Sequence, residues 1–250
     1  MKINKNTLFN IILIITGLIS LLIVLDYILG FTPHDYFYEQ NPGISFYVGV
    51  NVVSRWATFS YFTYHTMILF GIWAFLFGIS NLFKLEKLNN FLRYKSIVVF
   101  IFTNYLITTL LYTIFELTSG NITFGLYALN FKAIKNFITN IIGHYVLFIV
   151  MLLIFIKVRT NSNKNYHKHY LFMSLYIFIY YLYVLATGKF MYQIEWYPYP
   201  IFDTYSLFGT RLDIIVELII LFIISAILSV SYYFVLKLIT KLKNNLLLKR

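Results

Sequence analysis

Apolar residues fill six long runs of the chain, and polar residues concentrate between those runs. The runs are approximately 8–31, 54–80, 96–117, 139–157, 169–187 and 212–236. A helix needs about 20 apolar residues to cross the hydrocarbon layer, because each backbone N–H and C=O must be paired within the segment. The short alternating segments of a transmembrane barrel do not occur. The pattern predicts an all-α integral membrane protein, a single domain over 1–250 built as a six-transmembrane-helix bundle.

Composition supports this class. Hydrophobic residues make up 60% of the chain and charged residues 12%, and a soluble domain of 250 residues needs more polar surface. Cysteine is absent, which excludes a disulfide framework, a zinc–thiolate site and a cysteine nucleophile. Lys, Asn, Ile, Phe and Tyr outnumber Arg and Ala, as is typical of an AT-rich genome. We therefore expect a multi-pass protein in the plasma membrane of a low-GC bacterium.

Basic residues favour one side of the predicted bundle. Fifteen of the 20 Lys and Arg residues lie in the N-terminal segment, the second and fourth loops and the C-terminal tail. The positive-inside rule then predicts that both termini are cytoplasmic. The net charge of +11 is explained by topology and by contact with lipid headgroups, so we expect membrane lipids and no nucleic acid as partners.

The predicted external loops hold all four prolines and the aromatic segment "EWYPYPIFD" (195–203). Proline holds the backbone extended, and Tyr and Trp are favoured at the membrane interface. We expect this segment to fold over the outer mouth of the bundle. A short interfacial helix is expected around 128–138 in the third external loop.

Polar side chains collect in the outer half of the bundle. In the second run, residues 54–66 carry hydroxyls, an imidazole and a guanidinium, whereas the remainder is almost wholly apolar. With a rise of about 1.5 Å per residue, Thr63 is expected about 13 Å from the start of its helix, and His144 about 8 Å from the start of the fourth. Both helices run inward, so the two residues are expected at comparable depth.

Helical spacing groups these residues into stripes. The stripes are Ser60, Thr63 and Thr66; Asn136, Asn140 and His144; Asn104, Thr108, Tyr112 and Glu116; and the pair Asp213 and Glu217. Residues three or four apart share a helix face, and polar faces are costly against lipid. The stripes are expected to face the bundle interior or a wet cavity that opens to the outside.

Structural roles for the same residues stay open. Thr and Ser in membrane helices commonly bond to their own backbone, and a membrane His or Asn often joins two helices. His65 lies about 200° round the helix from Thr63, and we expect it to be structural. His144 with a carboxylate could ligate a metal, but no metal-binding spacing occurs within one helix, so neither a metal nor a cofactor is predicted.

Three segments resemble one membrane family in sequence and in order. They are "SYFTYHTMIL" (60–69), "NIIGHYVL" (140–147) and "YLYVLATGKFMYQIEWYPYPIFD" (181–203). Together they resemble the androgen-induced-gene-like membrane family and its bacterial six-helix relatives. The chain departs from the bacterial pattern at Thr66 and Met67, where Ser-Asn is usual, and it lacks the proline that usually follows the motif histidine.

The resemblance implies a hydrolase of lipid esters, chiefly fatty acid esters of hydroxy fatty acids, with an essential membrane Thr and His. By motif these are Thr63 and His144. A Thr hydroxyl needs an adjacent base, and imidazole can accept and return a proton near neutral pH. The second ring nitrogen could be held by Asn140 or by a carboxylate. The candidate carboxylates are Glu116, Asp213 and Glu217, and the candidate oxyanion donors are Ser60, Thr66 and Tyr112.

Two other functions fit the same outward-facing cavity. A membrane-embedded binding or transport subunit would use the cavity without chemistry and would need small-residue patches for a cytoplasmic partner. We find no such pair of small residues on the cytoplasmic side, which counts against this function. A non-catalytic structural protein is the third alternative. The sequence indicates neither the ester nor the oligomeric state.

Overall fold

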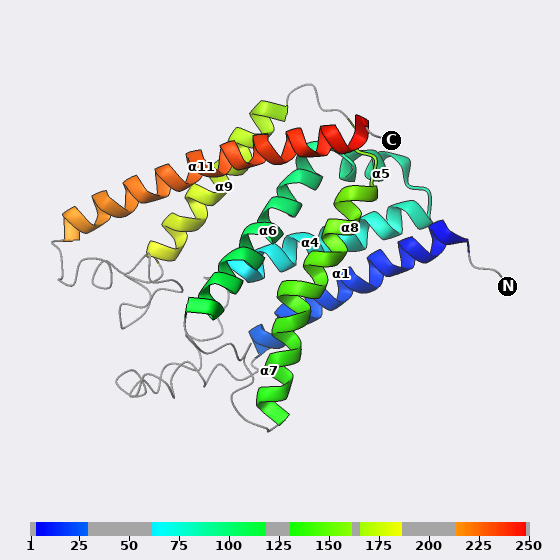
Figure 1. Cartoon of the computed structure of the whole chain (residues 1–250), viewed down its shortest axis with the longest axis horizontal. Coiled ribbons are helices and arrows are strands. Elements are labelled where there is room, and N and C mark those ends of the chain that lie inside the picture. Colours follow the sequence, from blue (N-terminus) through cyan, green and yellow to red (C-terminus); the bar gives the residue numbers. More distant parts are fainter. Residues whose placement is uncertain (1–3, 30–61, 119–130, 162–165, 187–213, 249–250) are drawn as a thin grey trace. The chain divides into compact units, whose positions relative to one another are not determined.

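A computed structural model describes residues 4–29, 62–118, 131–161, 166–186 and 214–248 (Figure 1). The helices are α1 (Lys5–Leu29), α4 (Phe62–Leu82), α5 (Glu86–Leu92), α6 (Lys95–Thr118), α7 (Phe131–Ile141), the π-helical turn η2 (Ile142–Val146), α8 (Leu147–Lys157), α9 (Tyr166–Ala186) and α11 (Ile214–Leu248). No strand occurs among these residues. The all-α part of the prediction is confirmed.

Five helical segments are long and apolar enough to cross a membrane. They are Asn6–Asp26, Phe62–Leu82, Lys95–Ile114, Ala133–Lys157 and Leu218–Leu246. Helix α9 is not among them; it begins with Tyr-His-Lys-His and carries six tyrosines, which lower its hydropathy. The chain therefore has the character of a multi-pass membrane protein, whereas six spans and cytoplasmic termini remain predictions.

The fourth membrane helix is longer than predicted. Helices α7 and α8 are joined through η2 into one continuous helix from Phe131 to Lys157, so the expected separate interfacial helix is its first part. Polar residues of α7 interrupt the apolar run, which is why the sequence pattern did not indicate this continuity. His144 consequently lies about 20 Å from the start of the helix, rather than about 8 Å. The described part of α4 begins at Phe62, so the depth predicted for Thr63 depends on residues outside the described part.

The chain divides into two compact units, 1–163 with 243–250, and 164–242. The single-domain prediction therefore stays a prediction. In the second unit, α9 and α11 pair in antiparallel fashion. The Ser229 hydroxyl donates to the Ser174 carbonyl oxygen at 2.7 Å, and the rings of Phe178 and Phe222 meet edge to face at 5.3 Å.

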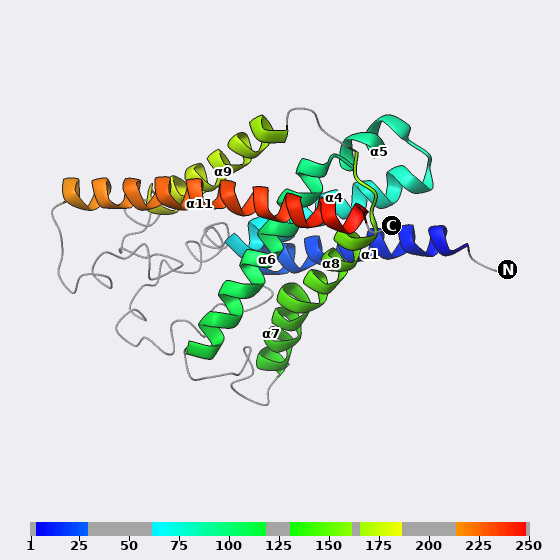
Figure 2. The same ribbon diagram turned by 45° about the horizontal axis from the view of Figure 1, so that its top comes forward.

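In the first unit, α1 and α4 pack closely in antiparallel order (Figure 1 and Figure 2). A Cβ at Gly17 would lie 2.7 Å from the Phe75 nitrogen and 2.8 Å from the Gly71 carbonyl oxygen. Near the other end, a Cβ at Gly78 would lie 2.8 Å from the carbonyl oxygen of Asn10. Small residues permit this approach between membrane helices. The Ser20 hydroxyl of α1 also donates a hydrogen bond to the Met67 carbonyl oxygen of α4 at 2.8 Å.

This packing corrects one expectation from the sequence. No small-residue pair was expected in the half of α4 predicted to be cytoplasmic, yet Ala74 and Gly78 are four residues apart and both are buried. Helix α1 packs directly against Gly78 through Asn10 and Ile14. The pair thus serves packing within the chain.

Helix α6 packs between α4 and the long fourth membrane helix. The Phe70 and Tyr105 rings meet edge to face at 5.1 Å, and the Phe102 and Phe155 rings stack at 4.1 Å. Close to the α8 end, the buried Lys243 ammonium donates to the carbonyl oxygens of Phe155 and Val158. Cations are favoured at a helix C-terminus, where the last carbonyls lack helical partners. The first unit is therefore a helical bundle. In it, α6 contacts both α4, which carries Thr63, and the helix that carries His144.

Candidate functional site

His144 occupies the centre of the π-helical turn η2. A π turn contains one more residue than an α-helical turn, and such turns are frequent at functional sites. Both Gly143 and His144 are buried, and His144 is only 5% exposed. The Met67 methyl group lies where a Cβ at Gly143 would have to be, so the Met67 side chain of α4 packs against η2 at this point. The sequence placed His144 in the membrane interior, and its burial in the bundle is confirmed.

Helix α6 holds both the ring and the backbone of His144. The Tyr112 ring stacks on the imidazole with 3.6 Å between the ring centroids and 7° between the planes. One turn earlier, the Thr109 hydroxyl donates to the His144 carbonyl oxygen at 2.8 Å. Thr109 and Tyr112 are three residues apart and share a helix face. The ring plane and the local backbone are therefore fixed by the same two turns of α6.

The Nδ1 atom of His144 is buried and has no hydrogen-bond partner among the residues that the structure describes. An imidazole nitrogen is a donor or an acceptor depending on the tautomer, and a buried polar atom without a partner is costly. A buried unsatisfied group in a native protein calls for a specific explanation. A group that must take up and release a proton is one such explanation.

Two pairs of hydroxyl groups join the helices next to His144: one joins α4 to α6, and the other joins α6 to η2. Thr66 of α4 and Thr108 of α6 lie 3.1 Å apart between their Oγ1 atoms, and both are buried. Thr113 of α6 lies 3.1 Å from the Tyr145 hydroxyl and also donates to the Thr109 carbonyl oxygen at 2.7 Å. The segment therefore combines an imidazole with several hydroxyls in an otherwise apolar bundle.

Thr63 lies at the edge of this cluster. It is half-buried on α4, three residues before Thr66 and four before Met67, and thus on their side of the helix. Met67 reaches Gly143, so α4 brings this face towards η2. Within the described residues, no hydrogen bond joins the Thr63 hydroxyl to His144. The pairing of the two residues stays a prediction.

The other predicted site residues differ in position. Tyr112 contacts His144 directly, and Thr66 is buried beside Thr108. Asn140 is half-buried one turn before His144. Glu116 lies on α6 and Glu217 on α11, but their side chains are outside the described part.

Ser60, Asp213 and the aromatic segment 195–203 also lie outside the described residues. In the part of the chain that the structure describes, no group of three His, Asp or Glu side chains gathers as a metal site. His65 is half-buried on α4. The structure thus assembles His144, Tyr112 and the threonines, and it does not place the carboxylates.

Four contributors to this cluster were not predicted from the sequence. They are Thr109, Thr113, Tyr145 and the close contact of Met67 with Gly143. Thr109 and Thr113 form an i, i+4 pair next to the stripe through Thr108 and Tyr112, and that spacing could have indicated them. The π turn had no such signal, because it changes the register of the helix without changing its composition.

Comparison with known proteins finds no family model, no curated protein and no solved structure that matches this chain.

Proposed function

We propose that this chain is a membrane-embedded lipid-ester hydrolase in which His144 acts as the general base and Thr63 as the nucleophile. The observation that carries the proposal is the buried imidazole without a partner at Nδ1 among the described residues, held on a π turn and stacked on the Tyr112 ring. A neutral imidazole in this setting can receive a proton from a hydroxyl and return it to a leaving group.

The reaction would proceed in two steps. As the Thr63 oxygen attacks the ester carbonyl carbon, its proton passes to His144, and the tetrahedral intermediate then expels the alcohol, which takes that proton. Water attacks the resulting acyl-threonine with the same base assisting, which releases the fatty acid and restores the threonine. Thr66 is three residues after Thr63 on α4 and also carries a hydroxyl. Thr66 and Tyr112 are the candidate donors of hydrogen bonds to the oxyanion.

The proposed substrate class is a fatty-acyl ester that reaches the site from the bilayer. The outward faces of the described helices are apolar, with large exposed side chains such as Leu110, Leu111 and Ile114 on α6. The same class follows from the resemblance of the segments around Thr63 and His144 to the lipid-ester hydrolase family. A binding subunit without chemistry is the alternative.

The test measures hydrolysis and active-site labelling on the purified protein in detergent. We expect Thr63→Ala and His144→Ala each to abolish release of the fluorophore from a fluorogenic long-chain acyl ester and to abolish covalent labelling by a fluorophosphonate. His65→Ala is the matched control, since it removes an imidazole only two residues from Thr63, and it should keep both signals. Thermal melting and gel filtration verify that each variant is folded.

Mass spectrometry of the labelled protein decides which residue is the nucleophile. An adduct on Thr63 supports the proposed assignment, and an adduct on Thr66 would transfer the role to that residue. A folded wild-type protein that neither hydrolyses acyl esters nor takes up the probe overturns the hydrolase proposal and favours the binding subunit.

A further inference from the structure

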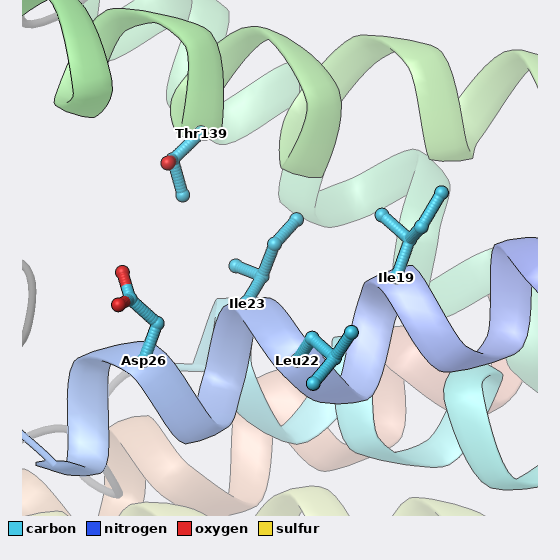
Figure 3. Close-up of a pocket in the computed structure, with 5 residues that line it drawn as sticks. All are labelled: Ile19, Leu22, Ile23, Asp26 and Thr139. Atoms are coloured by element: carbon cyan, nitrogen blue, oxygen red, sulfur yellow. The ribbon is translucent and has the colours of Figure 1, made fainter.

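A shallow pocket lies between α1 and α7, and Thr139 lines it from the α7 side (Figure 3). Ile19, Leu22 and Ile23 form its apolar wall on α1. Asp26 follows at the end of that wall and faces Thr139 across the pocket. The pocket is thus apolar along most of its length and polar at one end.

An ion pair stands at the polar end. The Lys135 ammonium of α7 lies 2.8 Å from the Asp26 carboxylate, and the two side chains are 28% and 23% exposed. Both side chains are therefore partly exposed rather than fully buried. An exposed ion pair contributes little to stability by itself, because solvent screens it and ordering two side chains costs entropy.

The pair lies at the boundary of the apolar segments. Asp26 is the last residue of the candidate span Asn6–Asp26, and Lys135 is two residues inside the span Ala133–Lys157. The ends of a membrane-spanning segment lie near the level of the headgroups and glycerol backbones. From Asp26 the wall continues to Ile19, about 10 Å along the helix towards the hydrocarbon. An amphiphile bound here would have its acyl chain on the isoleucines and its headgroup at the ion pair.

We propose that this pocket binds a zwitterionic phospholipid of the bilayer. The ammonium of such a headgroup would approach the Asp26 carboxylate, and its phosphate would approach the Lys135 ammonium. The two opposite charges of the site match the two of the headgroup, whereas an anionic headgroup without an ammonium would meet the Asp26 carboxylate unfavourably. This binding site is separate from the proposed hydrolase site and does not depend on it.

The test is native mass spectrometry of the detergent-purified protein after titration with phosphatidylethanolamine or phosphatidylglycerol that carry identical acyl chains. We expect wild type to retain phosphatidylethanolamine about fivefold more strongly, the factor for one favourable charge contact of about 1 kcal/mol. Asp26→Asn removes only the negative charge and should reverse this preference. Lys135→Gln should weaken retention of both lipids.

A second pair of variants leaves the charges intact. Ile23→Trp fills the pocket and should prevent retention of either lipid, whereas Leu25→Trp adds the same side chain at a similar depth on an exposed position of α1 outside the pocket. Leu25→Trp should behave as wild type. Equal retention by the two tryptophan variants, an unchanged preference in Asp26→Asn, or a wild type that prefers phosphatidylglycerol overturns the proposal. His144→Ala should retain the lipid as wild type does, so loss of hydrolysis and loss of this site are distinguishable.

Discussion

The rings of Tyr112 and His144 lie parallel, 7° apart in plane and 3.6 Å apart between centroids, and they come from different helices. A stacked ring restricts rotation about the Cβ–Cγ bond of the histidine without using either ring nitrogen. In a membrane interior, where water is scarce, this fixes the imidazole while leaving its proton chemistry available. The relationship connects packing of α6 against η2 directly to the proposed role of His144.

We predict that replacing the Tyr112 ring loosens His144. Tyr112→Leu should lower the stability of the folded protein by about 1 kcal/mol beyond the loss of buried area, because an aromatic pair of this kind contributes about that amount. Tyr112→Phe keeps the ring and should retain most of the stability. Chemical denaturation in detergent measures both variants. Equal destabilisation by Leu and Phe would show that the hydroxyl, and not the stacking, is the important contact.

The glycines at the interface between α1 and α4 should differ in how well they tolerate substitution by alanine. A Cβ at Gly17 meets backbone atoms of Phe75 and Gly71, whereas a Cβ at Gly71 first meets the flexible Leu21 side chain at 2.8 Å. We expect Gly17→Ala to destabilise by about 1–3 kcal/mol, as overpacking commonly does, and Gly71→Ala to cost less. Thermal melting of the two variants in one detergent gives the order. The reverse order would contradict the described packing of the two helices.

Lys243 should stabilise the end of α8. Lys243→Met keeps the length of the side chain but removes the donors to Phe155 and Val158, so two buried carbonyl groups lose a charged partner. We expect a loss of about 1–3 kcal/mol. Lys241→Met, at an exposed position two residues earlier, is the control and should melt as wild type does. If Lys243→Met melts as wild type does, water replaces the ammonium at these carbonyl oxygens.

The topology prediction can be tested on this cysteine-free chain with two single-cysteine variants. Because 15 of the 20 basic residues are assigned to one side, Lys164→Cys and Gln193→Cys should react with a membrane-impermeant maleimide from opposite faces of the membrane. Labelling in intact cells and in inverted vesicles distinguishes the faces. Reaction of both positions from the same side would remove the six-span arrangement and the depth assignments that depend on it.

Most helices and part of the site could be predicted from the sequence, for identifiable reasons. Long, mainly apolar runs located α1, α4 and α6, because length and overall hydropathy are the main requirements of a membrane span. Helix α7 was not joined to α8, because Lys132, Lys135 and Asn136 precede the apolar run that begins near 139, although the backbone is helical from Phe131 onward. Helical spacing placed Tyr112 and Thr108 on one stripe, and the structure brings that stripe to His144 and Thr66. The stacking and the π turn depend on which residues of one helix lie opposite which residues of the next. A single sequence does not contain that information.

The π turn limits which insertions and deletions this helix can accept during evolution. Relative to a regular helix, η2 adds one residue between α7 and α8, which rotates one half against the other by about 100°. The half with Lys135 can therefore face α1 while the half after Gly143 faces α6. Deleting one residue from Ile142–Val146 would restore a regular helix and turn one of these faces away from its neighbour. Single-residue insertions and deletions should therefore be tolerated less in this turn than conservative apolar substitutions in α8.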